Sequence, residues 1–205
     1  MSDLRRSLYF RLFGADGELR RHRLDVRTTL DIGCSDGRGS ELLTGAAGCD
    51  IYVPALREAV RHGRRRLPVA ADLRHLPYRD GAFDAVVALD VVEHFEKEDA
   101  LVVLAEMERV ARRLVAVLTP SGFVTQPPGE DEPWQEHRCG FHADELAERG
   151  YQVVGVGGAK GLRGDYAAFR GGPVGLGLAA VSRVTHRARP DRSYHLFASR
   201  PVPGR

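Results

Sequence analysis

Short apolar runs alternate with amphipathic segments along most of this chain. The run at 83–89 (FDAVVAL) is apolar at all but one position, which is typical of a strand that is buried on both faces of a parallel sheet. The segment 97–112 instead has its apolar residues three and four positions apart, as on one face of a helix. This alternation predicts an α/β fold, a doubly wound, Rossmann-like sheet with helices on both faces.

The same pattern gives approximate bounds for the elements. Strands are expected at 28–32, 49–53, 68–71, 83–89, 114–118, 151–156 and 194–199. Helices are expected at 4–13, 39–44, 55–63, 97–112 and 143–149, with a turn-rich stretch at 14–17. The glycine-rich stretch at 170–178 has no assignment.

Composition and length fit one domain in a reducing compartment. The chain has 205 residues, 43% of them hydrophobic and 28% charged, which predicts a single folded domain over 1–205 with a helical N-terminal extension at 1–27. Three cysteines without a C-x-x-C pair indicate neither a disulfide framework nor a structural zinc site. The N-terminus does not resemble a secretory signal, and no window approaches 18 apolar residues. We expect a cytoplasmic protein without a membrane anchor.

A glycine-rich turn, LDIGCSDGRGS at 30–40, follows the first predicted strand. A turn of small residues lets a ligand approach the main chain, although a plain strand-to-helix turn would have the same composition. Asp50 closes the next strand, where a carboxylate can accept hydrogen bonds from ribose hydroxyls. A solvated loop aspartate is the alternative for this residue.

The block 69–95 places further polar residues at strand ends. Asp72 follows the third strand, and Asp90, Glu93 and His94 follow the fourth. Ligands of open α/β sheets bind outside the carboxyl ends of the strands. We therefore expect Asp72 and Asp90 to meet Gly33 and Asp50 at one edge of the sheet.

These blocks resemble the class I S-adenosylmethionine-dependent methyltransferases of the "methyltransferase type 11" kind. The matching segments are DIGCSDG, CDIYVPALREA, ADLRHLPYRDGAFDAVVALDVVEHF and MERVARR, within about residues 28–120. The resemblance implies a seven-stranded, mostly parallel sheet whose last two strands form an antiparallel hairpin. It also implies S-adenosylmethionine as the cofactor. Ser35 replaces the middle glycine of the usual D-x-G-x-G-x-G turn, and we expect binding to survive this departure.

The resemblance implies a cofactor-binding role for nine residues. Asp31 and Gly33 would line the methionine end, Ser35 and Gly37 would shape the turn, Asp50 would hold the ribose, Ile51 would flank the adenine, Asp72 would accept from the adenine amino group, Leu73 would donate a backbone N–H, and the main chain at Leu89 would meet the ammonium group.

A dinucleotide-binding dehydrogenase also needs glycines and a later acid. Here the turn reads G-x-S-x-G, with Asp31 two residues before Gly33, and the block around LPYRDGAFDAVVALDVVEH has no place in the nicotinamide fingerprint. The sequence favours the methyltransferase.

His94 and His137 are the predicted general bases, because imidazole titrates near neutral pH; a structural role is the alternative for both. The segment 119–141 carries Trp134 and the acidic run 130–132, and with 157–193 it is predicted to cap the substrate. Trp134 could stack on an acceptor ring or pack within the loop. No metal site is predicted, although Asp90 and Glu93 could supply ligands.

The predicted function is methyl transfer from S-adenosylmethionine to an oxygen or nitrogen of a small molecule. The alternatives are an RNA methyltransferase and a non-catalytic cofactor-binding subunit. A net charge of +2 gives no indication of a nucleic-acid partner.

Overall fold

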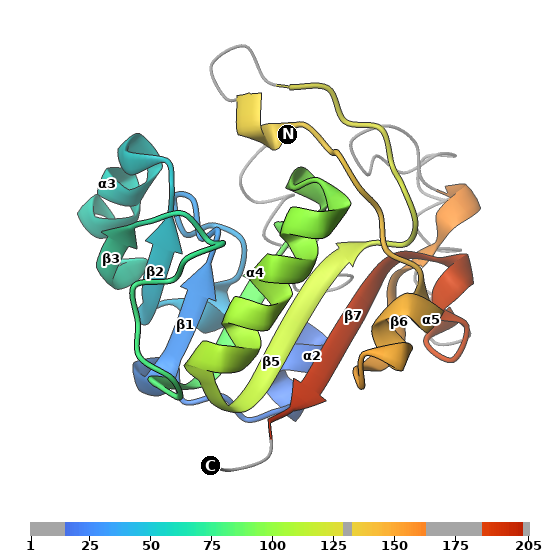
Figure 1. Cartoon of the computed structure of the whole chain (residues 1–205), viewed down its shortest axis with the longest axis horizontal. Helices are drawn as coiled ribbons and strands as arrows, with labels where there is room; N and C mark the ends of the chain where they lie inside the picture. The colour runs from blue at the N-terminus through green and yellow to red at the C-terminus, as the bar shows by residue number, and fades with distance from the viewer. Residues whose placement is uncertain (1–14, 129–132, 163–185, 203–205) are drawn as a thin grey trace.

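The computed structural model describes residues 15–128, 133–162 and 186–202. Within these ranges, seven strands form one sheet in the order β3-β2-β1-β4-β5-β7-β6 (Figure 1). The strands are β1 (Thr29–Ile32), β2 (Ala46–Asp50), β3 (Arg65–Ala70), β4 (Phe83–Leu89), β5 (Ala111–Pro120), β6 (Gln152–Ala159) and β7 (Ser193–Pro201). The predicted seven-stranded fold is confirmed.

The directions of the strands also agree with the prediction. β1 to β5 pair in parallel, whereas β7 lies antiparallel between β5 and β6. Both faces of β4 are buried, because Val86 and Ala88 pack into one core and Val87 into the other. This explains the continuous apolar run at 83–89.

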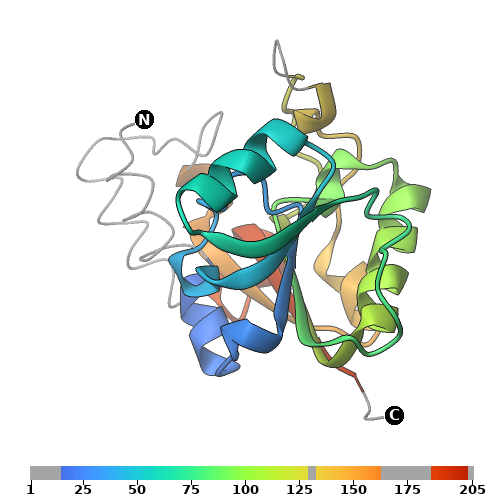
Figure 2. The same ribbon diagram turned by 90° about the vertical axis from the view of Figure 1, so that its left-hand side faces the viewer.

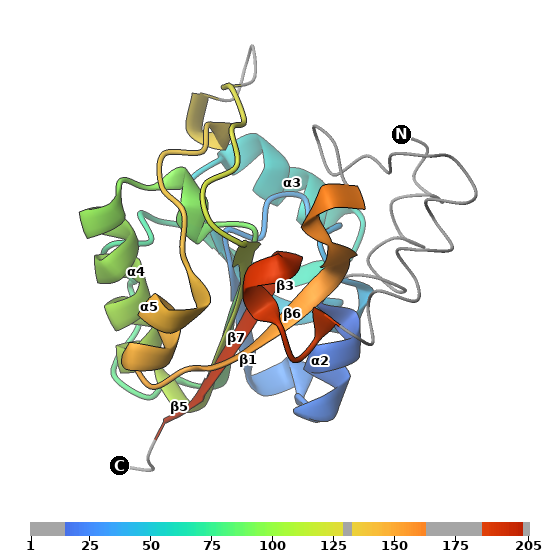
Figure 3. The ribbon, with the colours of Figure 1, turned by 90° about the vertical axis from the view of Figure 1, so that its right-hand side faces the viewer.

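Helices cover both faces of this sheet. The α-helices are α2 (Asp16–Arg21), α3 (Val53–Arg61), α4 (Lys97–Val110) and α5 (Ala143–Glu148). α4 and α5 lie on one face and α2 on the other, as Figures 2 and 3 show from the two sides. Single-turn 3-10 helices occur at η1 (Val26–Thr28), η2 (Glu41–Leu43), η3 (Val92–His94), η4 (Pro133–Gln135), η5 (Lys160–Leu162) and η7 (Pro190–Arg192).

The second strand differs from its prediction. β2 spans Ala46–Asp50 rather than 49–53, because the Asp50 carboxylate accepts a hydrogen bond from the Tyr52 backbone N–H and turns the chain at once. Pro54 then lies in the first turn of α3, a favoured position for proline. The small residues that open β2 carry little strand signal.

The predicted helix at 39–44 is wrong. Only η2 forms there, and Ser40 before it is extended, with φ −151°. The Ser40 hydroxyl accepts from the Leu42 N–H and donates to buried Asp16 of α2. The predicted turn-rich stretch at 14–17 also differs in part, because helix α2 begins at Asp16.

Other boundaries move by a few residues. β3 begins at Arg65 rather than 68, and α4 ends at Val110 because Ala111 already has extended backbone angles. The ends of β5, β6 and β7 extend beyond the predicted strands. The predicted helix at 4–13, the stretch 170–178 and most of 157–193 lie outside the described residues. In the described ranges, no helix combines the length and the apolar character needed to cross a bilayer.

Candidate functional site

A cavity of about 320 Å³ opens at the carboxyl ends of the parallel strands. The chain leaves β1 toward β2 on one side and enters β4 on the other, so this is the point where the strand order reverses and where such sheets bind ligands. The lining residues are Gly33, Ser35, 50–52, 72–74, Asp90, Val91, 94–96, Asp99, Trp134, Gln135 and Arg138.

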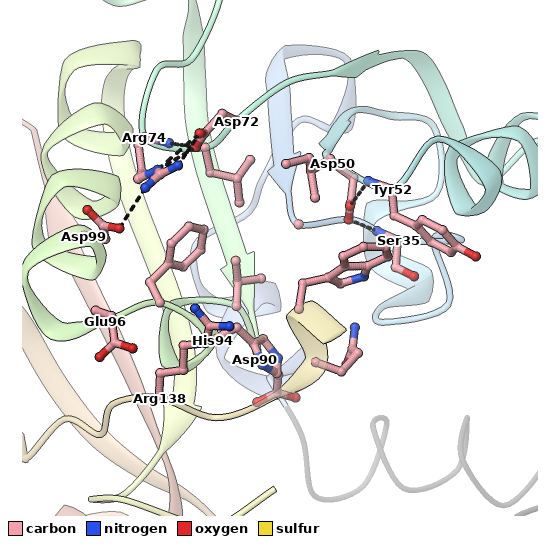
Figure 4. A pocket seen from close by; sticks show the side chains of 17 residues that line it. Ser35, Asp50, Tyr52, Asp72, Arg74, Asp90, His94, Glu96, Asp99 and Arg138 are labelled. Atoms are coloured by element: carbon pink, nitrogen blue, oxygen red, sulfur yellow. Dashed lines mark hydrogen bonds and ion pairs between the residues drawn. The ribbon is translucent and has the colours of Figure 1, made fainter. Parts of the chain in front are cut away.

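Asp50 lies on one wall of the cavity, where β2 ends. Its Oδ2 accepts a 2.7 Å hydrogen bond from the Ser35 backbone N–H, and its Oδ1 accepts a 2.8 Å bond from the N–H of Tyr52 (Figure 4). These bonds fix the carboxylate between the two loops. Each oxygen retains a second lone pair for a hydroxyl group of a ligand.

The glycine turn after β1 takes a left-handed course. Gly33 has φ +61°, and a Cβ there would lie 2.5 Å from a methyl carbon of Val91, so no other residue fits. Ser35 also has a positive φ, +46°. The connection from this turn to β2 is described throughout and contains no α-helix. It therefore lacks the helix N-terminus that binds the diphosphate of a dinucleotide.

Asp72 lies on the wall that follows β3. Arg74 forms a 2.7 Å ion pair with it, and the same guanidinium reaches Asp99 of α4 at 2.8 Å (Figure 4). The hydrogen bonds from Arg74 lower the pKa of Asp72, so this carboxylate is ionised at neutral pH. Leu73, which lies between Asp72 and Arg74 in the sequence, is buried.

The lining is acidic overall. It contains five carboxylates and two guanidinium groups, which leaves three negative charges in excess when the histidine is neutral. A cationic ligand gains from such a field, whereas a polyphosphate loses. The carboxylates are Asp50, Asp72, Asp90, Glu96 and Asp99, and the guanidinium groups are Arg74 and Arg138.

The two predicted bases lie next to each other. The rings of His94 and His137 are 4.9 Å apart between centroids. The Nδ1 of His94 is 3.1 Å from the carbonyl oxygen of Glu136, and that of His137 is 2.7 Å from the carbonyl oxygen of Val124. Burial lowers the pKa of both, so both imidazoles are neutral at pH 7. His94 lines the cavity, and His137 lies behind it.

Glu93 is buried beside these rings, with 1% of its surface exposed. Its Oε2 accepts a 3.1 Å hydrogen bond from the hydroxyl of Thr119 in β5. Burial raises its pKa well above the ordinary range, and the Asp90 carboxylate adds to the effect. Its backbone carbonyl accepts from the N–H groups of Arg138 and Cys139, which brings the later loop against η3.

The segment after β5 rises above the carboxyl edge of the sheet (Figure 3). Trp134 of η4 lies 4.9 Å, between ring centroids, from Tyr52, which follows β2. Trp134, Gln135 and Arg138 all line the cavity. The acidic run at 130–132 lies outside the described residues.

Comparison with known proteins identifies the domain. A family model described as a methyltransferase domain matches residues 30–122. A probable S-adenosylmethionine-dependent methyltransferase of Mycobacterium tuberculosis is 36% identical over 131 residues, which are 60% of this chain and 47% of that protein. The chain contains a class I methyltransferase domain. S-adenosylmethionine is the cofactor of this class.

Two other proteins are similar to the methyltransferase domain, one in sequence and one in fold. The tRNA (carboxymethyluridine(34)-5-O)-methyltransferase of Arabidopsis thaliana is 32% identical over 97 residues, 46% of this chain and 22% of that protein. Magnesium protoporphyrin IX methyltransferase from Synechocystis shares the fold, with a TM-score of 0.56 at 15% identity, over 97% of this chain and 83% of the other. The match spans about half the length of the first M. tuberculosis relative.

Six of the nine predicted cofactor residues line the cavity of this methyltransferase domain: Gly33, Ser35, Asp50, Ile51, Asp72 and Leu73. The other three, Asp31, Gly37 and Leu89, do not belong to the lining. Asp31 is buried in β1, and its Oδ2 is 2.7 Å from the guanidinium of Arg65. Gly37 adopts φ +81°, a left-handed conformation that favours glycine.

Sequence reasoning missed Arg74, Tyr52 and Arg65. Arg74 carried a signal, because an arginine two residues after Asp72 can reach back to the same carboxylate. Tyr52 and Arg65 carried none. Their partners, Trp134 and Asp31, are distant along the chain and meet them only through the fold.

Proposed function

We propose that this chain binds S-adenosylmethionine at the carboxyl edge of its sheet and transfers the methyl group to an oxygen or nitrogen of a small molecule. The acidic cavity is the observation that carries the proposal. It has a fixed carboxylate at the end of β2 and a second one after β3. S-adenosylmethionine carries a sulfonium, an ammonium and only one carboxylate, so it suits a lining with excess negative charge.

In this proposal Asp50 accepts hydrogen bonds from the ribose hydroxyls, and Ile51 flanks the adenine. Ile51 is 60% exposed, which leaves an apolar surface free for a ring. Asp72 accepts from the adenine amino group, and the Leu73 N–H donates to the ring. Gly33, with Asp31 beneath it and Leu89 nearby, faces the methionine end, while Ser35 and Gly37 shape the turn.

The acceptor is proposed to bind between η3 and the loop at 119–141. His94, Trp134 and Arg138 face the cavity from this side. Trp134 supplies a flat apolar surface and Arg138 a fixed positive charge. The volume of about 320 Å³ is at the lower end of the range for ligand pockets, which favours a small acceptor or a group that projects from a larger one.

When bound, S-adenosylmethionine supplies an electrophilic methyl carbon, and the protein has to align a nucleophile with it. The cavity walls orient the acceptor and exclude water from it. For a hydroxyl acceptor, His94 is proposed to accept the proton at Nε2, because its Nδ1 is directed at the Glu136 carbonyl. His137 packs against His94 and holds its ring in place.

A substitution at His137 tests this arrangement. His137→Ala is expected to lower turnover while cofactor affinity stays within about twofold. Calorimetry with S-adenosylhomocysteine measures the affinity, and a coupled assay for the same product measures turnover. Full activity in the variant would remove His137 from the mechanism.

An RNA acceptor is the second proposal, and the tRNA methyltransferase among the relatives supports it. Against it, Glu96 and Asp99 lie in the lining, where they would repel a phosphate. Binding to a tRNA mixture at rising salt separates the two proposals. Affinity that falls steeply with salt would favour RNA, whereas no measurable affinity at low salt would exclude it.

A non-catalytic cofactor-binding subunit is the third alternative. Incubation with methyl-labelled S-adenosylmethionine and a metabolite extract decides it, because only an enzyme labels an acceptor.

The domain arrangement and the location are parts of the same proposal. We propose one domain over 1–205, in which 119–141 and 157–193 cap the substrate, and a cytoplasmic location. The three cysteines support the location, since all are buried free thiols.

A further inference from the structure

Three metal-binding side chains meet behind the acceptor end of the cavity. One ligand atom from each of Glu93, His94 and His137 lies within 4.8 Å of the other two. Two donors of a tetrahedral zinc ion are about 3.4 Å apart, since each bond is about 2.1 Å long. A closure of up to about 1.4 Å would therefore bring the three ligand atoms around one ion.

Both histidines are oriented as metal ligands usually are. Their Nδ1 atoms lie 3.1 Å and 2.7 Å from the backbone carbonyl oxygens of Glu136 and Val124. A carbonyl accepts but cannot donate, so each Nδ1 carries the hydrogen and each Nε2 is the unprotonated nitrogen, whose lone pair can bind a metal. A backbone carbonyl on the second nitrogen is the usual way in which proteins fix the tautomer of a ligating histidine.

Glu93 supplies the observation that points to a ligand. Its carboxylate is buried, and its Oε1 has no hydrogen-bond partner among the described residues. Its other oxygen accepts from a neutral hydroxyl, that of Thr119. In the described part of the chain, no lysine or arginine forms an ion pair with it. A buried carboxylate without a positive partner is costly, and a bound cation would remove that cost.

We propose that Glu93, His94 and His137 bind one divalent transition-metal cation at the acceptor end of the cavity. Two imidazoles and one carboxylate form a ligand set that suits zinc, iron and similar ions, whereas magnesium prefers oxygen ligands throughout. Three protein ligands leave at least one coordination position free. His94 lies at the boundary between the cluster and the cavity, so this position is within reach of an acceptor.

The role of the ion rests on the proposed function. An acceptor hydroxyl that coordinates the cation has a lowered pKa and loses its proton to solvent. The resulting oxygen anion forms a bond to the methyl carbon as the C–S bond breaks and its electron pair returns to sulfur. The products are a methyl ether, S-adenosylhomocysteine and one proton. In the loaded protein the two histidines act as ligands, and the cation replaces His94 as the group that activates the hydroxyl.

The test uses metal binding itself and needs no acceptor. The full chain is stripped with a chelator and titrated with Co²⁺, whose visible spectrum reports nitrogen and oxygen ligands, and with Zn²⁺ in calorimetry. We expect one ion per chain. His94→Ala and His137→Ala should each weaken binding at least about tenfold, since altering a group that merely orients a ligand costs about 10 to 100-fold.

His62→Ala is the matched control. His62 lies on the surface at the end of α3, 3.4 Å from the carboxylate of Glu58, and therefore offers a histidine and an acid without a third ligand. The His62→Ala variant should bind metal as tightly as the unaltered chain does. Glu93→Gln keeps the size of the side chain, and S-adenosylhomocysteine binding checks that each variant is folded.

The inference is overturned if the stripped chain takes up no ion, or if His62→Ala lowers affinity as much as His94→Ala does. The proposed function fails separately. A chain that binds S-adenosylhomocysteine but no metal would keep the methyl transfer and leave His94 as the base. A chain that binds metal but no S-adenosyl compound would keep the metal site and lose the proposed function.

Discussion

Replacing Asp50 by alanine should weaken binding of S-adenosylhomocysteine roughly 100-fold. In the account above, the carboxylate accepts a hydrogen bond from each of two ribose hydroxyls. A hydrogen bond to a charged group contributes about 1.5 kcal/mol or more, so two contribute about 3 kcal/mol, and each 1.4 kcal/mol is about a factor of ten in affinity. Calorimetric titration measures this change directly.

The same substitution also removes two bonds within the protein. The N–H groups of Ser35 and Tyr52 lose their acceptor, and each unsatisfied donor costs about 1 kcal/mol or more where water cannot reach it. We therefore expect a loss of roughly 2 kcal/mol in the free energy of unfolding, measured in urea. This loss must be separated from the loss of ribose contacts.

Two controls achieve that separation. Asp36→Ala removes an acid from the loop that also contains Ser35. Asp36 pairs with Arg38 at 2.8 Å and does not line the cavity, so the affinity for S-adenosylhomocysteine should change less than about threefold. The unaltered chain should bind the 2′-deoxy analogue of S-adenosylhomocysteine more weakly than S-adenosylhomocysteine itself. The Asp50→Ala variant should bind both ligands with the same affinity. Affinity of a folded Asp50→Ala within twofold of the original would refute the ribose contact.

Other predictions concern stability and reactivity. Ser35→Gly should raise the free energy of unfolding by up to about 1 kcal/mol without weakening S-adenosylhomocysteine binding, because it relieves a side chain held at φ +46°; a destabilised variant would contradict this reasoning. Arg65→Met should cost about 3 to 5 kcal/mol, since it leaves buried Asp31 without its partner, and adding Asp31→Asn should recover part of the loss in the same urea experiment. Burial raises the pKa of all three cysteines, that of Cys49 to about 12, so their thiols stay protonated between pH 7 and 9. Iodoacetamide should accordingly label them slowly in the folded chain over this range and rapidly in denaturant. A cysteine that reacts in the folded chain at the rate of a free thiol would contradict this prediction.

The strand ends could be predicted from sequence because they combine two strong local signals. An apolar run followed by an acid marks both a buried strand and its carboxyl end, and Asp72 and Asp90 were found in this way. β2 was displaced because Ala46, Ala47 and Gly48 are too small to show the pattern. Asp50 was still found, because the acid itself was interpreted as the end of a strand, and it does close β2 although the predicted bounds 49–53 extend beyond it.

The contacts between loops could not be predicted, because they depend on three-dimensional register. His94 and His137 were each singled out, but nothing in their spacing showed that their rings would touch. The backbone bonds from Arg138 and Cys139 to the Glu93 carbonyl bring them together, and main-chain bonds of this kind leave no trace in residue types. The missing helix after the glycine turn has a similar cause, since Ser40 bonds to Asp16, 24 residues away.

A titration with S-adenosylhomocysteine that is followed by the fluorescence of Trp134 shows whether this cavity binds S-adenosyl compounds. Trp134 is the single tryptophan of the chain and lines the cavity, so its fluorescence reports what enters. We expect a change in emission that saturates at one ligand per chain and that NAD⁺ does not reverse. An emission that S-adenosylhomocysteine leaves unchanged while NAD⁺ alters it would mean that the cavity binds a dinucleotide and not an S-adenosyl compound.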